Sequence, residues 1–213
     1  DYQALRVFGI RQVTQADIAF AEELGYAIKL LGISRMADGR LVQRLKPCLV
    51  PKHSTLGMVE GVFNAVEIKG DGAGENISIG RGAGAGPTAS AVVSDIVDLA
   101  CGSHRPCFGV PVGELITAEH ADSGMQNGRF YIRLSVVDKS GVLAEVAGIL
   151  RDHNISIEAM LQRSRDPLQS VPLVLITHEA SQQDIFEACE QISGLSSVLE
   201  SPCVMHIEEL QEE

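Results

Sequence analysis

The chain has 213 residues, with 28 acidic and 17 basic side chains and a formal net charge of −11. Hydrophobic residues make up 45% of it, which suffices for one large folded domain or two small ones and excludes a disordered chain. The acidic balance argues against a nucleic-acid or anionic-membrane surface, and no apolar run reaches the roughly 18 residues of a membrane span. Five dispersed cysteines do not form a disulfide framework, so we expect a reducing, cytoplasmic location.

The first hundred residues alternate between helix and strand signals. Thr14 and Asp17 form a capping-box pattern at the start of a helix that stops at Gly25. The apolar run that follows predicts a strand buried on both faces, and Asp38-Gly39 predicts a hairpin turn. The expected strands of this half lie at 27–33, 41–49, 62–68 and 77–79. A second helix is expected from Pro87 to Ala100, ended by Gly102.

The rest of the chain changes character twice. Residues 103–127 are rich in Pro, Gly, Ser and His without periodicity, which predicts a linker. The segment 128–213 then repeats strand and helix patterns in the order β-α-β-β-α-β, which is the ferredoxin-like motif. Its strands are expected at 129–137, 155–161, 171–177 and 198–207, and its helices at 141–151 and 181–192. This segment carries a net charge of −8 against −3 for residues 1–127, which favours two domains.

Seven of the 21 glycines fall between Gly70 and Gly86. Within them, Gly80 to Ala85 matches the G-x-G-x-x-A dinucleotide fingerprint between a predicted strand and a predicted helix. Glycines let a backbone approach a ligand closely, and a helix N-terminus offers free N–H groups to negative charge. The second strand and terminal acid of a full Rossmann unit are missing after the helix. The pattern therefore fits a ligand-contacting turn or a tight packing turn equally well.

Two other patterns can be interpreted either as functional sites or as ordinary structural features. Cys101, His104, Cys107 and His120 could together hold zinc, but their spacing lacks the paired cysteines of structural sites, which favours surface thiols. Lys29 lies in an apolar run and could be a catalytic lysine with a pKa lowered by burial, although a snorkelling lysine at a strand edge is favoured.

In the last segment, Asp138, Lys139, Ser140 and Gly141 join a predicted strand to a predicted helix. The exposed N–H groups of such a turn can bind a small carboxylate, and the plain alternative is N-capping by Ser140 or Asp138. Asn154 follows the same helix, where the chain returns to the sheet. The acidic end of the chain, Glu208 to Glu213, predicts a solvated terminus.

Two stretches together resemble one family. The segment from Gly80 to Ala100, GRGAGAGPTASAVVSDIVDLA, resembles the glycine-rich segment of homoserine dehydrogenase, as do AEELGYAIKLLG from Ala21 and FNAV from Phe63. Residues 129–213, with VDKSGVLAEVA from Val137, resemble an ACT domain, a small amino-acid sensor appended to many such enzymes. The predicted fold class is therefore α/β (α+β): a mixed-sheet catalytic and dimerisation region at 1–102, a linker at 103–127, and an ACT domain at 128–213.

The resemblance implies what the chain holds and what it lacks. The family's NAD(P)-binding domain, its catalytic lysine, its homoserine-binding acids and its sodium site precede the part that is matched, so residue 1 is expected to correspond to the middle of an enzyme. No catalytic residue is then expected in this chain, and no metal. The resemblance implies that Gly82, Ala83 and Gly84 contact the nicotinamide end of NADP or NAD, and that strands between residues 27 and 79 form one sheet that also builds a dimer interface.

Two functions follow from the resemblance. The whole enzyme would interconvert aspartate semialdehyde and homoserine with NADP or NAD, and this fragment alone would be inactive. The alternative is a non-catalytic regulatory and dimerisation module. It would bind an amino acid, with threonine as the expected effector, at Asp138, Lys139, Ser140, Gly141 and Asn154, where ACT domains pair. A homodimer without nucleic-acid or membrane partners is expected in both cases.

Overall fold

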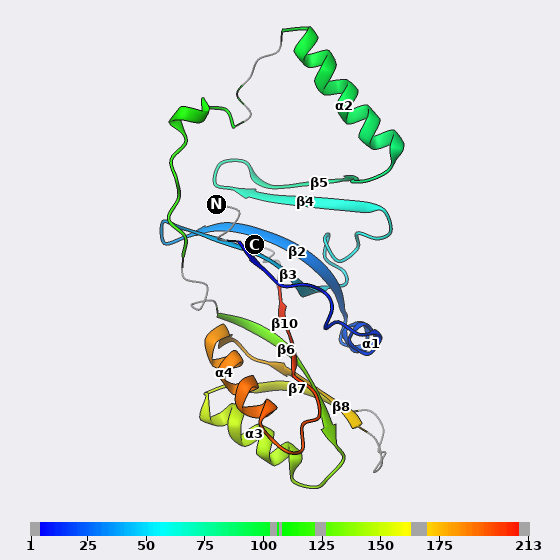
Figure 1. Ribbon diagram of the computed structural model, residues 1–213, viewed down its shortest axis with the longest axis vertical. Coiled ribbons are helices and arrows are strands. Elements are labelled where there is room, and N and C mark those ends of the chain that lie inside the picture. Colours follow the sequence, from blue (N-terminus) through cyan, green and yellow to red (C-terminus); the bar gives the residue numbers. More distant parts are fainter. Residues whose placement is uncertain (1–4, 103–105, 107, 122–126, 163–169, 209–213) are drawn as a thin grey trace. The chain divides into compact units, whose positions relative to one another are not determined.

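We analysed a computed structural model of the chain, which describes residues 5–102, 106, 108–121, 127–162 and 170–208. It divides into two compact units, one of Asp1–Gly57 with Glu119–Glu213 and one of Met58–Ala118 (Figure 1). The sequence predicts boundaries at 102 and 127 instead. The two divisions differ because strand pairing joins the N-terminal residues to the C-terminal segment, which composition and charge do not reveal.

The larger unit is built on one mixed sheet. Its strands lie in the order β1 (Arg6–Val7), β3 (Arg40–Pro51), β10 (Cys203–Ile207), β6 (Asn127–Val137), β8 (Ser170–Thr177) and β7 (Ile157–Gln162). Two further strands lie off this path: β2 (Tyr26–Ala37) pairs with β3, and β9 (Ala180–Ser181) pairs with β6. Strand β10 runs antiparallel to β6 and parallel to β3, so it connects the two parts of the sequence.

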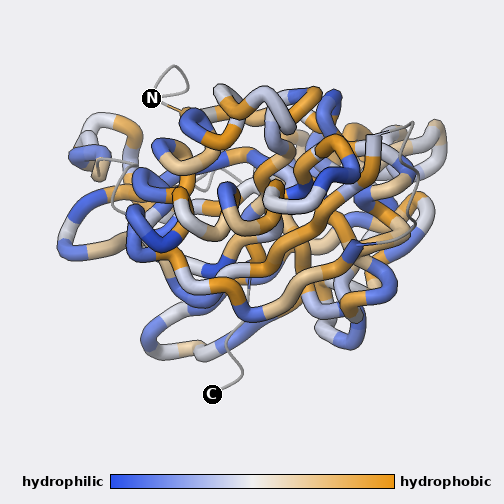
Figure 2. Tube along the Cα trace, turned by 90° about the horizontal axis from the view of Figure 1, so that it is seen from below, coloured by the Kyte–Doolittle hydropathy of each residue, from blue (hydrophilic) through white to orange (hydrophobic). Residues whose placement is uncertain are grey.

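The C-terminal part of this sheet confirms the predicted β-α-β-β-α-β order. Helices α3 (Val142–Asp152) and α4 (Gln182–Ser193) lie together on one side of β6, β7 and β8 (Figure 1). Strand β6 alternates, with Phe130, Ile132 and Leu134 facing the two helices and Tyr131 facing the opposite side. Figure 2 shows hydrophobic residues along the strands and hydrophilic residues at the turns between them.

The opposite face of the sheet is covered by α1 (Gln15–Glu23). Phe20 and Ala21 of this helix are buried against a cluster that includes Tyr131, Val174 and Met205. Thr14 and Asp17 form the predicted capping box, and Gly25 follows the helix with a φ of 83°. The sheet therefore lies between α1 and the pair α3 and α4, a layering that the sequence did not predict.

The hairpin of β2 and β3 turns at Asp38 and Gly39, whose φ angles of 50° and 75° confirm the predicted turn. The prediction that residues 27–33 form a strand buried on both faces is wrong in one respect. The strand exists, but its side chains are half-buried or exposed, with Leu30 53% exposed. The reason is its position: among the described residues β2 pairs only with β3, so it lies at an edge.

The smaller unit contains a hairpin of β4 (Phe63–Gly70) and β5 (Gly74–Arg81), the helix α2 (Ala85–Ala100) and the short 3₁₀-helix η2 (Val112–Glu114). The expectation of one sheet for the strands between residues 27 and 79 is therefore wrong for the described residues. Strand β2 pairs with β3, and β3 pairs in addition with β1 and β10, whereas β4 and β5 form a sheet of their own. None of the residues of α2 is buried, and Val92, Ile96 and Leu99 are more than half exposed. Among the described residues, no helix is long and apolar enough to span a membrane.

A buried carboxylate ties α1 to the sheet. The Asp17 side chain is completely buried, and its Oδ1 accepts hydrogen bonds from Arg133 Nε at 2.6 Å and the Tyr131 hydroxyl at 2.9 Å. Its Oδ2 accepts from the backbone N–H and the hydroxyl of Thr14, both at 2.7 Å. Burial alone would raise the pKa of Asp17, but these hydrogen bonds and the Arg133 charge outweigh burial and lower the pKa below its ordinary 3.8.

We expect Asp17→Asn to lower the free energy of unfolding by about 3 kcal/mol at pH 7, because it leaves the Arg133 guanidinium without its buried counter-ion. The contribution of a carboxylate with a lowered pKa is complete above the unfolded value and is lost as pH falls through the folded one. The difference from the native chain should therefore shrink below about pH 4 in urea unfolding. As a control, Asp184→Asn removes a first-turn acid of α4 and should cost less than about 1 kcal/mol. Equal losses for the two variants would contradict the argument.

Candidate functional site

The turn between β6 and α3 brings four of the predicted effector residues together. Asp138 to Gly141 line a hollow of about 480 Å³, with Leu143, Gln162 and Leu173 among its other walls. Gly141 is the N-cap of α3, with a left-handed φ of 102° and no side-chain hydrogen bond to the helix. The alternative of capping by Ser140 or Asp138 is therefore wrong, and these two side chains are left available at the hollow.

Asn154 does not belong to this hollow. It follows the C-terminal end of α3 with a φ of 56°, whereas Asp138 to Gly141 precede the N-terminal end. A helix of 11 residues is roughly 16 Å long, so the two groups lie at opposite ends of it. Within one copy of the chain, the structure separates Asn154 from the other four predicted effector residues.

The glycine turn lies between β5 and α2, as the sequence predicts. Gly84 is the N-cap of α2 and has a φ of 120°, which side-chain-bearing residues rarely adopt. A Cβ on Gly82 would lie 2.1 Å from Asn64 Nδ2, so the absence of a side chain lets the two segments approach closely.

The start of α2 is suited to contact with a negatively charged group. The helix has no acidic residue in its first turn and no side-chain cap, so the N–H groups of Ala85 and Gly86 have no intrahelical partner. Pro87 lacks an N–H, and Thr88 is the first residue to donate into the helix, to Gly84. The whole turn is exposed. Gly82, Ala83 and Gly84 are thus an open stretch of backbone without charged side chains, directly after Arg81 at the end of β5.

The structure also contains a buried cation that the sequence analysis missed. Lys46 on β3 is 8% exposed, whereas Lys29, the lysine singled out from the sequence, is half-buried on the edge strand β2. Burial, with a smaller contribution from the neighbouring Arg44 charge, lowers the pKa of Lys46 to about 8. The alternating pattern of β3 around Lys46 is a signal that could have found it, since a polar residue there faces the interior.

Lys46 is part of a polar group at the junction of β3 and β10. Arg44 Nη2 lies 2.9 and 2.7 Å from the two carboxylate oxygens of Glu208, and His206 Nδ1 lies 2.8 Å from Glu208 Oε2. Burial lowers the pKa of His206, although contact with Glu208 opposes this. Cys48, buried beside this group, has its pKa raised to about 12 by burial. Glu208 is therefore a partly buried structural carboxylate with its side chain 17% exposed, which corrects its assignment to a solvated tail.

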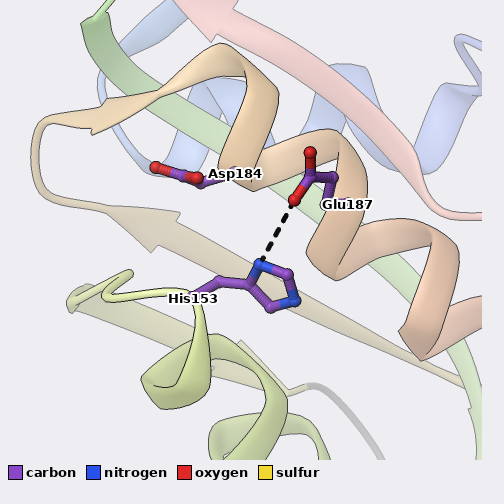
Figure 3. Close-up of side chains that lie close together, drawn as sticks. All are labelled: His153, Asp184 and Glu187. Atoms are coloured by element: carbon purple, nitrogen blue, oxygen red, sulfur yellow. Dashed lines mark ion pairs between the residues drawn. The ribbon is translucent and has the colours of Figure 1, made fainter.

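Three side chains on α3 and α4 lie close enough to share a metal ion. Atoms of His153, Asp184 and Glu187 lie within 4.8 Å of one another, and His153 Nδ1 is 4.0 Å from Glu187 Oε2 (Figure 3). The two carboxylates have structural roles that require no metal. Asp184 is an acidic residue in the first turn of α4, and Glu187 accepts a hydrogen bond from Gln183. The zinc pattern of the sequence lies partly outside the described residues, since His104 and Cys107 are not described. Cys101 ends α2, and His120 forms a β-bridge with Leu41.

The comparisons with known proteins match two successive parts of the sequence, and the first of these spans the boundary at Gly57 between the two compact units. Residues 1–97 match the homoserine dehydrogenase family, and residues 130–194 match the ACT domain family. The chain is 35% identical over 211 residues to a homoserine dehydrogenase from Neisseria gonorrhoeae, covering 96% of this chain and 48% of that protein. It is 31% identical over 215 residues to one from Bacillus subtilis, covering 98% and 48%.

Solved structures give the same picture. The crystal structure of a homoserine dehydrogenase from Thiobacillus denitrificans matches with a TM-score of 0.83 and 34% identity, over 99% of this chain and 49% of that one. The S. aureus homoserine dehydrogenase at pH 6.0 matches with a TM-score of 0.62 and 25% identity, over 99% and 49%. The chain thus spans about half the length of the relatives it matches.

The fold places the chain in a class of mixed α/β proteins in which a ferredoxin-like βαββαβ unit follows a second α/β part. More specifically, the chain consists of a homoserine dehydrogenase domain followed by an ACT domain. The resemblance recognised in the glycine segment and in the strand–turn–helix at Val137 is confirmed.

Lys46 provides a prediction about pH. Its folded pKa of about 8 lies below the ordinary 10.5, so between these values the unfolded chain binds a proton that the folded chain does not. Stability should therefore rise with pH in this range, by roughly 1.4 kcal/mol per unit. Lys46→Met cannot titrate and serves as the reference. In urea unfolding between pH 7.5 and 10, we expect the native chain to gain stability relative to this variant. Parallel curves would show that Lys46 is not desolvated in the folded state.

Proposed function

We propose that this chain forms part of an NAD(P)-dependent homoserine dehydrogenase, which interconverts aspartate semialdehyde and homoserine in amino-acid biosynthesis. The observation that carries the proposal is the glycine turn at the head of α2, because it lies inside the segment matched by the dehydrogenase family. The relatives are about twice as long as this chain. We therefore place the catalytic lysine and most of the nucleotide contacts in the portion of the enzyme that these 213 residues do not span.

The chain's own contribution to the cofactor site is the backbone of Gly82, Ala83 and Gly84. Bound nicotinamide would supply the hydride chemistry. The turn can lie flat against it because Gly82 and Gly84 carry no side chains, and the free N–H groups of α2 favour nearby negative charge. The exposed apolar face of α2 and of the β4–β5 hairpin supports packing against a further part of the enzyme. The buried free thiols of Cys48, Cys189 and Cys203 support a reducing, cytoplasmic location.

The second candidate function is regulatory. The hollow at Asp138 to Gly141 combines a carboxylate, an ammonium group, a hydroxyl and a helix N-terminus, and these suit the charged ends of an amino acid. We propose threonine as the effector. Asn154 lies at the other end of α3, so it can complete the site only from a second copy of the chain. This geometry supports a homodimer in which two ACT domains pair.

The catalytic proposal predicts that the whole protein is active and that these 213 residues alone are inactive, which an enzyme assay can measure. Homoserine oxidation with NADP or NAD should be detectable for the protein made from the whole reading frame and absent for these 213 residues alone. In the active protein, Gly82→Ala should raise the KM for the nucleotide about tenfold, because the new methyl group forces Asn64 outward and holds the turn off the cofactor.

Gly72→Ala is the matched control, since a Cβ there meets no atom within 4 Å and the residue lies at the far end of the hairpin. Its KM should stay at the native value. Turnover by the isolated chain would refute the claim that the remainder of the enzyme carries the chemistry.

The regulatory proposal predicts that millimolar threonine raises the Tm of this chain and releases heat in calorimetry. Asp138→Asn should abolish both signals, because it removes a charge from the hollow. The control is Asp152→Asn, at the other end of α3, where the carboxylate is exposed and contacts only Arg151 among the described residues. If threonine leaves both the Tm and the heat unchanged, the ACT domain has a structural role and the proposal fails.

A further inference from the structure

The larger unit contains a second hollow, of about 570 Å³, that none of the predicted sites uses. One wall is a face of α4, another is β10 with the residues that precede it, and a third is the segment 7–13. This volume is in the range of sites that bind small molecules. The hollow joins residues from both matched families, because the segment 7–13 and Lys46 belong to the first and α4 to the second.

Polar groups gather at one place on its wall. Lys46, Gln182 and His206 line the hollow and are 8%, 6% and 7% exposed. Lys46 Nζ lies 3.4 Å from Gln182 Oε1, a long contact for a charged donor. His206 Nε2 is buried and has no hydrogen-bond partner in the part of the chain that the structure describes. Buried polar groups are ordinarily satisfied, so the unpartnered His206 Nε2 and the long contact of Lys46 together suggest a missing partner.

The charge balance indicates the sign of that partner. The carboxylate of Glu208, which lies beside these groups, is already engaged by Arg44 and His206. Among the described residues, no carboxylate lies within 4.0 Å of Lys46 Nζ. A buried ammonium group costs free energy unless it is paired. Two exposed residues of opposite charge, Arg11 and Glu190, also line the hollow. The buried Lys46 is therefore the charge on this wall that no described carboxylate contacts, and an anion would satisfy it.

Apart from the polar side chains of Arg11, Gln12, Glu190, Ser193 and Ser201, the remaining walls are apolar. Phe130, Phe186 and Val204 line the hollow together with Pro47 and Met205. Hydrocarbon surface of this kind favours a ligand with an aliphatic body over phosphate or a sugar, whose polar atoms would lose their water here. One cation beside an amide matches the two oxygens of a single carboxylate better than the charge of a phosphate.

We propose that this hollow binds a small aliphatic carboxylate, whose charged end contacts Lys46 and Gln182 and whose hydrocarbon body lies against Phe130, Phe186 and Val204. The site is distinct from the turn at Asp138 to Gly141 and independent of the functions proposed above. A ligand here would contact the dehydrogenase domain and the ACT domain at once. It would therefore stabilise the junction between β3 and β10.

The test uses valerate as the probe and the 213-residue chain as the protein. Titration calorimetry should detect one valerate per chain, and 1-pentanol, with the same body and no charge, should bind at least about tenfold more weakly. Lys46→Met should weaken valerate binding by about tenfold or more. Lys29→Met is the matched control, since this lysine lies on β2 outside the hollow, and its affinity should equal that of the native chain.

A second measurement does not depend on the stability of Lys46→Met. The chain contains no tryptophan, so Phe186→Trp places a single fluorophore on the wall of the hollow at a side chain that is 44% exposed. Saturable valerate should change its emission, and 1-pentanol at the same concentration should not.

Three outcomes would overturn the proposal. One is the absence of both heat and a change in emission at about 20 mM valerate, a concentration high enough to reveal even weak binding at this site. Another is valerate binding that survives Lys46→Met unchanged. The third is binding that is abolished by Asp138→Asn or displaced by threonine, which would place the carboxylate at the turn before α3 instead.

Discussion

Strand β10 is hydrogen-bonded along both edges, to β6 in an antiparallel ladder and to β3 in a parallel one. The parallel contact is short, pairing His206 and Ile207 with Cys48 and Leu49, yet it makes one sheet of two segments that lie more than 150 residues apart. Cys48, Leu49 and Val50 of β3 are completely buried as a result. Without this pairing, β3 would be the exposed edge of a hairpin, and exposed edges are prone to pair with other chains.

Two polar contacts accompany that pairing. Asp17 fixes α1 to β6 through Arg133 and Tyr131, and it also caps the helix to which it belongs. Arg44 on β3 contacts Glu208 just beyond β10. Removing one partner of a buried ion pair costs more than the pair itself contributes, so each contact penalises any arrangement in which the two domains separate. The ACT domain is thus joined to the dehydrogenase domain by a shared sheet and by buried charges.

The two hollows of the larger unit differ in the domains that form them. The turn at Asp138 to Gly141 lies within the ACT domain, whereas the hollow at Lys46 is formed by both domains. A ligand changes an equilibrium only through different affinities for its states. The carboxylate proposed for the hollow at Lys46 would meet that condition in a state in which the two domains had moved apart, because the walls it contacts would then be separated.

The sequence alone was sufficient for elements whose signals are local. The capping box at Thr14 and Asp17, the turn at Asp38 and Gly39, and the strand–helix order of the ACT domain depend on neighbouring residues, and all three were predicted. The glycine segment located the turn before α2 in the same way. The tertiary structure decided which strand lies at an edge, that Glu208 is partly buried and paired, that Lys46 rather than Lys29 is the buried lysine, and that Asn154 lies far from the turn at Asp138. These features depend on contacts between segments that are distant in the sequence. A side chain is buried only if another segment packs over it, and the local sequence of a strand does not specify which strand will pair with it.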